Sequence, residues 1–387
     1  MRKFVASLLI PLFIAASAAE TVEIRSSRQV VIDNSEAVGV HSIQIDADHR
    51  TVVAGSVYSL GSAWAIKADQ DGHVVWRITV PSESPQIPAD ASAFDDSTII
   101  DDGVTVLCGR VGVQPPAPRP DYLLFVGKNG QKLFEKRFIP RDSDIVISSI
   151  SKCVAWNGGI LTVGNASKRG PYGPASPSGN YYWIAFLDAS RNVKWEREIP
   201  TTIGSEFLTS LRVIKDGSVA FSVTDNRETQ VIRVGKEGSI LAGDMLVGAY
   251  TLIQPDNTSA PVRLLPVMPD MHWEVVSLDD QLKVIDRTSS NKKLNMVVRS
   301  VWSIRDSGLV VFGESVRNGA LRWAAIRRVS DNLEKIIDIN ASFLNQTFTI
   351  DAVNYDSPLG QFVLAYSVIE PLKASGAKRT YLEQFTD

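Results

Sequence analysis

The sequence predicts an all-β protein: a seven-bladed β-propeller of four-stranded antiparallel blades, with the ring closed by the N-terminal strand. Three observations predict this fold. The chain contains an internal repeat of roughly 50 residues. Each repeat contains four short strand-like runs, and the last repeat lacks its fourth strand. A repeat of this kind is typical of propellers. Six or eight blades remain possible, because the fifth repeat is poorly marked.

The repeat is clearest in the first half of the chain. The run TVVAGSV, followed by AWAIKADQDGHVVWRITVP, corresponds to VTVLCGRV with DYLLFVGKNGQKLFEKRFIP, and again to ILTVGNAS with YYWIAFLDASRNVKWEREIP. Constant spacing within a varying sequence indicates a structural repeat. Weaker copies continue to the end of the chain. The equivalent anchor positions of the seven repeats are Gly55, Gly109, Gly164, Ser222, Pro266, Gly313 and Tyr366.

Each repeat is interpreted as four strands separated by turns. In the first repeat the runs HSIQID, TVVAGSV, AWAIKA and VVWRITV are separated by DADHR, SLGS and DQDG. β-Branched and aromatic residues favour strands, whereas Asp and Gly favour turns. The seventh repeat ends at its third strand, TYLEQFTD. We therefore expect the strand-like run VEIRSSRQVVID near the N-terminus to supply its outer strand, which would remove an open sheet edge.

The first 19 residues predict a signal peptide. Arg2 and Lys3 precede a short apolar run, and Ala16-Ser17-Ala18 fits the small-residue cleavage pattern. The apolar run is too short for an ordinary membrane span. We expect an exported protein, periplasmic or extracellular, in which residues 20–387 form a single propeller domain with no membrane span after signal removal.

The two cysteines, Cys108 and Cys153, lie in strand-like runs. In an oxidising compartment such a pair can form a disulfide. The alternative is two buried thiols that act as small hydrophobic side chains. A bridge requires Cα atoms within about 7 Å, so the sequence leaves both alternatives open.

The turn and aromatic residues of the first repeat give a resemblance to a known group. The run D-x-D-G-x-x-x-W, from Asp69 to Trp76, resembles the repeats of quinoprotein-type (PQQ-like) propellers. The resemblance implies the blade and does not imply the activity. Quinoprotein repeats usually carry Thr-Gly in this turn, whereas the turn here is Asp71-Gly72. We accordingly expect no cofactor.

Catalytic and metal-binding patterns are scarce. The four histidines form no H-x-H or HExxH spacing, and the chain has no G-x-S-x-G elbow and no P-loop. The innermost strands carry small polar residues at similar places, which crowding at the propeller axis explains. If a ligand enters the central channel, we expect His41, Arg299 and Asp351 to contact it.

Two long Pro-rich loops, at about residues 112–121 and 166–180, are the strongest candidates for a binding surface, because loops on a rigid scaffold commonly carry function. Arg and Tyr are common anchors at interfaces. The expected partner-binding residues are Arg119, Lys168, Arg169, Tyr172, Arg317 and Arg379.

The sequence favours a binding or interaction module whose partner is an envelope protein or glycan. One alternative is an enzyme that acts on a sugar or small metabolite in the central channel, and another is a structural envelope protein. A formal net charge of −3 argues against a nucleic-acid binder, which would usually be basic.

Overall fold

The computed structural model describes residues 25–33, 38–57, 61–83, 92–100, 103–112, 120–138, 145–168, 180–200, 203, 207–225, 227–254, 262–268, 270–293, 295–303, 309–315, 321–326, 334–338, 347–356, 361–369 and 378–386. These residues form strands and turns, and the expected signal peptide lies outside them. No helix within the described ranges is long and apolar enough to cross a membrane.

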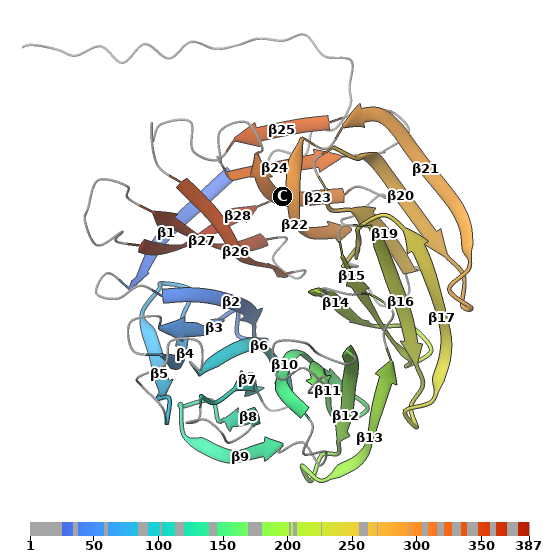
Figure 1. Cartoon of the computed structure of the whole chain (residues 1–387). Coiled ribbons are helices and arrows are strands. Elements are labelled where there is room, and N and C mark those ends of the chain that lie inside the picture. Colours follow the sequence, from blue (N-terminus) through green and yellow to red (C-terminus); the bar gives the residue numbers. More distant parts are fainter. Residues whose placement is uncertain are drawn as a thin grey trace, which may run out of the picture.

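The described strands form seven four-stranded antiparallel sheets around a common axis (Figure 1). Successive sheets are called blades 1 to 7. Blade 1 contains β2 (Val38–Ile45), β3 (Thr51–Val57), β4 (Ser62–Ala68) and β5 (Val74–Val80). Blade 2 contains β6 (Ala93–Ile100), β7 (Val104–Arg110), β8 (Asp121–Val126) and β9 (Lys132–Phe138). Blade 3 contains β10 (Ile145–Trp156), β11 (Gly159–Lys168), β12 (Asn180–Leu187) and β13 (Val193–Pro200).

The remaining blades follow the same order from the axis outward. Blade 4 contains β14 (Phe207–Val213), β15 (Val219–Thr224), β16 (Glu228–Val234) and β17 (Ile240–Val247). Blade 5 contains β18 (Tyr250–Leu252), β19 (Val262–Pro266), β20 (His272–Leu278) and β21 (Val284–Lys293). Blade 6 contains β22 (Met296–Ser303), β23 (Leu309–Ser315), β24 (Leu321–Ile326) and β25 (Glu334–Asp338). Blade 7 contains β26 (Thr347–Asp356), β27 (Gln361–Ile369) and β28 (Lys378–Thr386).

The N-terminal strand closes the ring, as the sequence predicts. β1 (Arg25–Asp33) pairs antiparallel with β28, so the order in blade 7 is β26-β27-β28-β1. The two ends of the described chain therefore lie in one sheet, with Arg25 opposite Thr386. This pairing joins the first and last strands of the domain and covers an edge that would otherwise be open.

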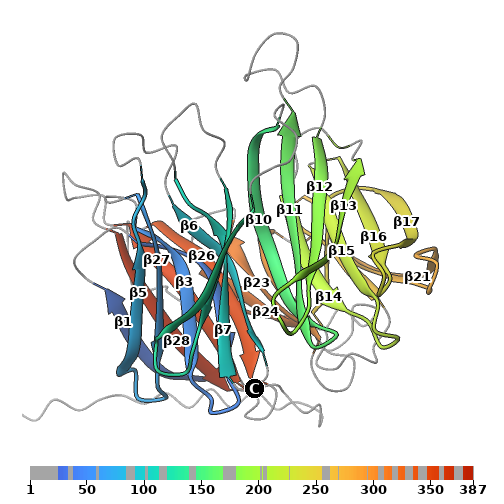
Figure 2. The same ribbon diagram turned by 90° about the horizontal axis from the view of Figure 1, so that it is seen from below.

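The hydrophobic core lies between neighbouring blades. β3 and β4 are buried along their whole length, whereas the outer strand β5 alternates between exposed and buried residues. One cluster joins blades 1 and 2 through Trp76 and Leu124, and another joins blades 3 and 4 through Trp156 and Phe221. Middle strands have no solvent face, which explains their continuous runs of apolar residues. Figure 2 shows the blades from the side.

The repeat glycines mark a close approach between the first two strands of a blade. Gly55 on β3 pairs with Val40 on β2, next to a register shift between Val40 and Ser42. A Cβ atom at Gly55 would overlap the carbonyl oxygen of Gly39. Gly109 lies against Ala93 in the same way, beside the corresponding shift in blade 2. At these two positions the backbone of the innermost strand leaves no room for a Cβ atom, so glycine is required.

Candidate functional site

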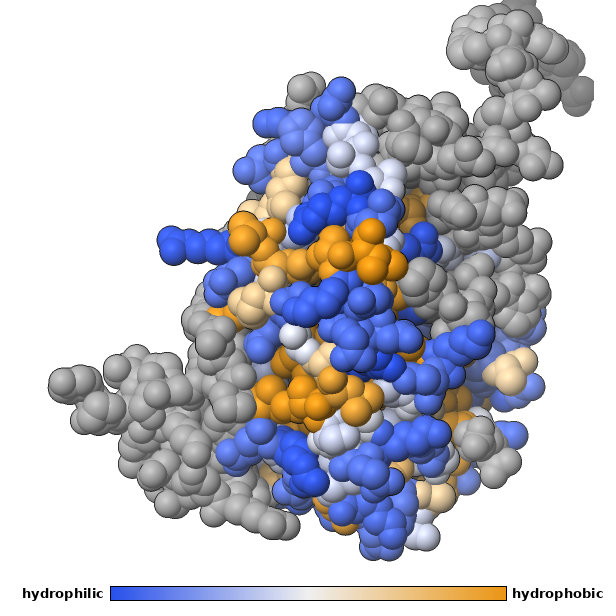
Figure 3. Space-filling view, turned by 90° about the vertical axis from the view of Figure 1, so that its right-hand side faces the viewer, coloured by the Kyte–Doolittle hydropathy of each residue, from blue (hydrophilic) through white to orange (hydrophobic). Residues whose placement is uncertain are grey.

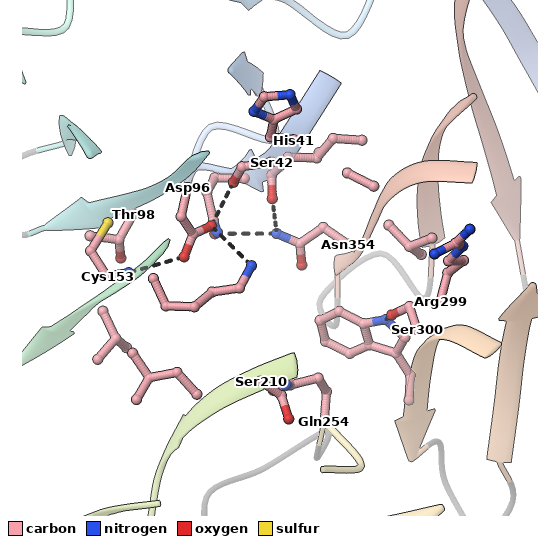
Figure 4. A pocket seen from close by; sticks show the side chains of 18 residues that line it. His41, Ser42, Asp96, Thr98, Cys153, Ser210, Gln254, Arg299, Ser300 and Asn354 are labelled. Carbon is pink, nitrogen blue, oxygen red and sulfur yellow. Dashed lines mark hydrogen bonds and ion pairs between the residues drawn. The ribbon is translucent and has the colours of Figure 1, made fainter. Parts of the chain in front are cut away.

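A pocket of about 330 Å³ lies at the axis of the propeller (Figure 4). The innermost strands of six blades line it, together with Gln254, which follows β18 in blade 5. Most of the lining comes from the middle and C-terminal half of each innermost strand. The lining residues are His41, Ser42, Ile43, Gln44, Asp96, Thr98, Lys152, Cys153, Val154, Ser210, Leu211, Gln254, Arg299, Ser300, Trp302, Ala352, Val353 and Asn354.

A β-bulge recurs at the same place on six innermost strands. In each strand one residue is left out of register with the neighbouring second strand. Bulges re-aim side chains and are common beside functional sites. The bulge residues, in chain order, are His41, Asp95, Ser151, Thr209, Arg299 and Asp351.

All three channel residues expected from the sequence occupy these bulges. The structure brings His41 and Arg299 together in the lining of the axial pocket. Asp351 lies on β26, where its backbone is described and its side chain is not. Sequence reasoning missed Asp95, the bulge residue of blade 2, although its position relative to Gly109 matches that of His41 relative to Gly55.

Bulge residues pair with the residue that follows the repeat glycine. In blade 2, Asp95 Oδ2 lies 2.7 Å from an Arg110 guanidinium nitrogen. In blade 6 the charges are reversed: the Arg299 guanidinium contacts both carboxylate oxygens of Glu314, at 3.2 and 3.0 Å. In blade 3 the Ser151 hydroxyl donates to the Asn165 side-chain oxygen at 3.3 Å. The same backbone geometry thus holds a charged pair of either polarity or a neutral pair.

His41 and Asp95 form a pair across the junction of blades 1 and 2. His41 Nδ1 lies 3.4 Å from Asp95 Oδ1 and 3.1 Å from the carbonyl oxygen of Phe94. The Ser149 hydroxyl donates to Asp95 Oδ2 at 3.0 Å. Burial alone would raise the pKa of Asp95, but the hydrogen bond with His41 and the charge of Arg110 outweigh it, so this pKa is lowered. Asp95 is therefore a carboxylate at neutral pH.

Asp96, beside the bulge, joins three blades. It accepts a hydrogen bond from the Ser42 hydroxyl of blade 1 at 2.9 Å and one from the backbone N–H of Cys153 in blade 3 at 3.0 Å. Lys152 Nζ lies 3.9 Å from Asp96 Oδ1, the oxygen that Ser42 also contacts. Figure 4 shows Asp96 between Ser42 and Cys153. Asp96 is a structural junction as well as part of the pocket wall.

Small polar residues near the axis cap the edge of the next blade. The Ser42 hydroxyl accepts the backbone N–H of Ser97, and the Ser210 hydroxyl accepts that of Leu252, at 3.1 and 3.0 Å. An innermost strand is a sheet edge whose buried N–H groups need partners. From the sequence these residues were attributed to crowding at the axis or to a ligand in the channel, so their capping role was missed. The signal that could have revealed it is Ser or Asp directly after four of the six bulge positions, at Ser42, Asp96, Ser210 and Ser300.

The opposite wall of the pocket carries amide and indole groups. The Asn354 side-chain amide donates to the carbonyl of Ile43 at 2.9 Å and to Gln44 Oε1 at 3.2 Å, which joins blades 7 and 1. Trp302 Nε1 donates to the Ser300 hydroxyl at 2.8 Å, and its ring lies 6.2 Å from that of Tyr355. These contacts fix the orientation of the indole at the pocket.

Two groups among the described side chains have the composition of metal ligands. Asp96, Cys108 and Cys153 form a buried group beside the pocket. Asp69, Asp71 and His73 form an exposed group in the turn before β5. In that turn Asp69 Oδ1 already accepts the backbone N–H groups of Asp71 and His73, both at 2.9 Å. Turn chemistry therefore accounts for the second group.

The structure does not describe the side chains of the loop residues expected to bind a partner. Arg119, Arg169, Tyr172 and Arg317 lie outside the described residues. Lys168 ends β11 and Arg379 belongs to β28, and of these two only the backbone is described. Because β11 extends to Lys168 and β12 begins at Asn180, the segment between them is shorter than the sequence suggested.

No protein-family model matches the sequence, and no curated protein matches it. Solved structures do match. A catalytically inactive virginiamycin B lyase from Staphylococcus aureus with quinupristin has a TM-score of 0.52 at 11% identity, covering 93% of this chain and 99% of that chain. The Dos1 propeller has a TM-score of 0.53 at 12% identity, covering 90% and 77%. YCF48 bound to D1 peptide has a TM-score of 0.52 at 11% identity, covering 93% and 95%. These likenesses show the β-propeller fold.

Proposed function

We propose that this protein is an exported binding module that holds a neutral, hydroxyl-rich ligand, a sugar unit of an envelope glycan, in the axial pocket. The pairing of charges around the pocket carries this proposal. Lys152 faces Asp96 at 3.9 Å, and Arg299 faces Glu314 at 3.0 Å. His41 faces Asp95 at 3.4 Å. A strongly charged ligand would have to compete with these pairs, whereas a neutral ligand leaves them intact.

The uncharged lining residues suit a ligand with many hydroxyl groups. Side-chain amides and hydroxyls offer both donors and acceptors, which is what a sugar requires. Trp302 adds an apolar ring face with a polar edge, against which a C–H face of a sugar can pack. A volume of about 330 Å³ lies in the range of small-molecule pockets. The amide and hydroxyl groups are those of Ser42, Gln44, Thr98, Ser210, Gln254, Ser300 and Asn354.

The hydrogen bonds of the pocket favour binding over catalysis. Ser42 donates to Asp96 and contacts Ser97, so it is not oriented by a histidine as a nucleophilic serine would be. Lys152 Nζ lies 3.9 Å from Asp96 Oδ1, so its ammonium faces a carboxylate and not the open pocket alone. Since one fold hosts unrelated functions, this inference comes from the pocket and not from the propeller neighbours.

The pair of His41 and Asp95 favours a second candidate, an enzyme that acts on a sugar or small metabolite in the channel. A carboxylate at Nδ1 orients a histidine, as in general-base catalysis. If this candidate is right, His41→Gln abolishes turnover of a ligand that the variant still binds. If the binding module is right, the unmodified ligand is recovered from the wild-type protein after prolonged incubation.

The Pro-rich loops remain a proposed contact surface for an envelope protein. They join second to third strands, at the end of the blade where the innermost strand begins, and the pocket lies toward the other end. Alanine at Arg119, Arg169 and Tyr172 together is expected to weaken partner capture without lowering the melting temperature. Unchanged capture by this triple variant would place the partner surface elsewhere.

The pocket is tested with an array of neutral and acidic oligosaccharides, followed by calorimetry on the strongest neutral binder. Gln254 is suited to the test, because its backbone groups make the strand contacts with Val301 and Ser303 while its side chain lines the pocket. We expect Gln254→Ala to weaken binding on the order of 10-fold, the loss of a well-placed polar contact. Gln281→Ala, in an exposed turn of blade 5, is the matched control. Equal affinities of both variants, or binding of acidic sugars alone, would contradict the proposal.

A further inference from the structure

Cys108 and Cys153 face each other across the junction of blades 2 and 3. Cys108 lies on β7 and Cys153 on the innermost strand β10, 45 positions later in the chain. Their Sγ atoms are 2.7 Å apart, and both are free thiols in the structure. Both side chains are buried, at 0% and 5% exposed, in a cluster that includes Val106 and Ile150. The fold thus brings together two thiols that lie far apart in the sequence.

The two thiols differ in their access to the pocket. Cys153 lines the axial pocket, whereas Cys108 lies behind it and donates to the carbonyl oxygen of Asp96 at 3.4 Å. Burial raises the pKa of both thiols, and that of Cys108 well above its ordinary value. A reagent in the pocket therefore meets Cys153 first.

We propose that Cys108 and Cys153 form a disulfide that joins blades 2 and 3 at the wall of the axial pocket. The inference rests on the exported location proposed above only for its oxidant, a small or protein disulfide. The Cys153 thiolate attacks one sulfur of that oxidant and displaces its first thiolate, which gives a mixed disulfide. The Cys108 thiolate then attacks Cys153 Sγ and displaces the second thiolate. The protein loses two protons and two electrons, and the oxidant becomes two thiols.

The disulfide would stabilise the junction of blades 2 and 3, where Asp96 is hydrogen-bonded at the pocket. Cys153 donates its backbone N–H to Asp96, and its neighbour Lys152 contacts the same carboxylate. A disulfide between residues 45 positions apart restricts the unfolded chain more than the folded one. Reduction is therefore expected to lower the melting temperature by on the order of 5 °C. Because the sulfurs are buried, a reductant should reduce the bond slowly in the native protein and rapidly in the unfolded protein.

The test uses the full chain in a buffer of reduced and oxidised glutathione at pH 8. The protein is then unfolded, treated with N-ethylmaleimide, and analysed by intact mass and peptide mapping. We expect no alkylation before reduction, two alkylated cysteines after reduction, and a peptide pair that links Cys108 to Cys153. Two alkylated cysteines in unreduced protein would overturn the proposal. So would thiols that become alkylated only after a chelator is added, which would indicate a metal held by Asp96, Cys108 and Cys153.

A separate measurement tests the exported location independently of the disulfide. The redox state is also determined on protein trapped with N-ethylmaleimide in the producing cell. Free thiols there, combined with a disulfide in the glutathione buffer, support the pair and contradict the exported location. Cys108→Ser with Cys153→Ser provides the control for stability: its melting temperature should not respond to a reductant, whereas that of the wild type should fall.

Discussion

Blade 2 and blade 5 are both four-stranded sheets of the propeller, but their innermost strands differ in length and in backbone geometry. In blade 2 the innermost strand β6 has eight residues, a bulge at Asp95, and Gly109 opposite the bulge. In blade 5 the innermost strand β18 has three residues, which pair with β19 without a register shift, and Pro266 stands at the anchor position. The comparison explains why the repeat fades in the fifth unit. Glycine pairs with the residue before the bulge in blades 1, 2, 3 and 6, whereas Val223 and Tyr366 take that position in blades 4 and 7.

The outer strands differ as well. β9 of blade 2 reads KLFEKRF and exposes one large apolar residue, Leu133, among charged ones. β17 and β21, in blades 4 and 5, instead expose apolar side chains, and Figure 3 shows apolar side chains gathered on this side of the molecule. The blades therefore differ in the side chains that their outer strands expose to solvent. The exposed residues are Ile240, Leu241, Met245, Val247, Val284 and Ile285.

The largest effect is expected when the buried ion pair of blade 1 is broken. An exposed ion pair between blades 4 and 5 serves as the comparison. Asp46 lies 2.5 Å from Lys67 Nζ, and both side chains are nearly fully buried. Asp46→Ala should lower the free energy of unfolding by about 3–5 kcal/mol, because Lys67 is left buried without its partner. Asp244 pairs with Lys283 at the rim, and Asp244→Ala should cost at most about 1 kcal/mol. Urea unfolding of both variants measures the difference, and equal losses would refute it.

The anchor glycine provides the next test. Gly109→Ala should lower the free energy of unfolding by about 2–3 kcal/mol, because the new Cβ overlaps the Ala93 carbonyl and the bulge must shift. Pro266→Ala, at the equivalent position of blade 5, should change it by no more than about 1 kcal/mol. Thermal unfolding followed by circular dichroism compares them. A Gly109→Ala protein as stable as Pro266→Ala would mean that the bulge is not the reason for the repeat.

Acid should weaken blade 1 through Asp46. Burial by itself raises the pKa of Asp46, but hydrogen bonds from Lys67 and the Arg50 backbone and the charge of Lys67 bring it below the ordinary value of 3.8. Its contribution is therefore complete above pH 3.8 and is lost as the pH falls from 3.8 through the lower pKa of the folded state. Stability measured between pH 7 and pH 2 should fall less steeply for Asp46→Asn than for the wild type. Parallel curves would show that Asp46 contributes nothing to acid unfolding.

The smallest effect is expected at the rim. Val247 is 89% exposed, and Val247→Lys should change the free energy of unfolding by no more than about 0.5 kcal/mol. Leu246, the preceding residue on β17, is 5% exposed, and Leu246→Lys should destabilise the protein by several-fold more, because the ammonium enters the core between blades 4 and 5. Urea unfolding of the two variants places the boundary of the core. Similar losses of unfolding free energy in the two variants would mean that the core extends to Val247.

Much of the fold was predictable because its signals are local. Asp69 and Gly72 mark a turn, in which Gly72 has a positive φ, and Gly55 and Gly109 mark close approaches between backbones. The pairing of β1 with β28 was also predictable, since a missing strand at one end of the chain matched a spare strand at the other. The site was predicted less completely. His41 and Arg299 were identified as channel residues, but Asp95 and Asp96 were not.

The sequence by itself determined the repeat, the strands within it and the closure of the ring, because hydrophobic patterning and turn chemistry act over a few residues. Tertiary structure decided which polar groups meet at the axis. Asp96 contacts Ser42 and Cys153 from two other blades, and Cys108 meets Cys153 across 45 positions. Such contacts depend on how whole blades pack, and no spacing within one repeat encodes them.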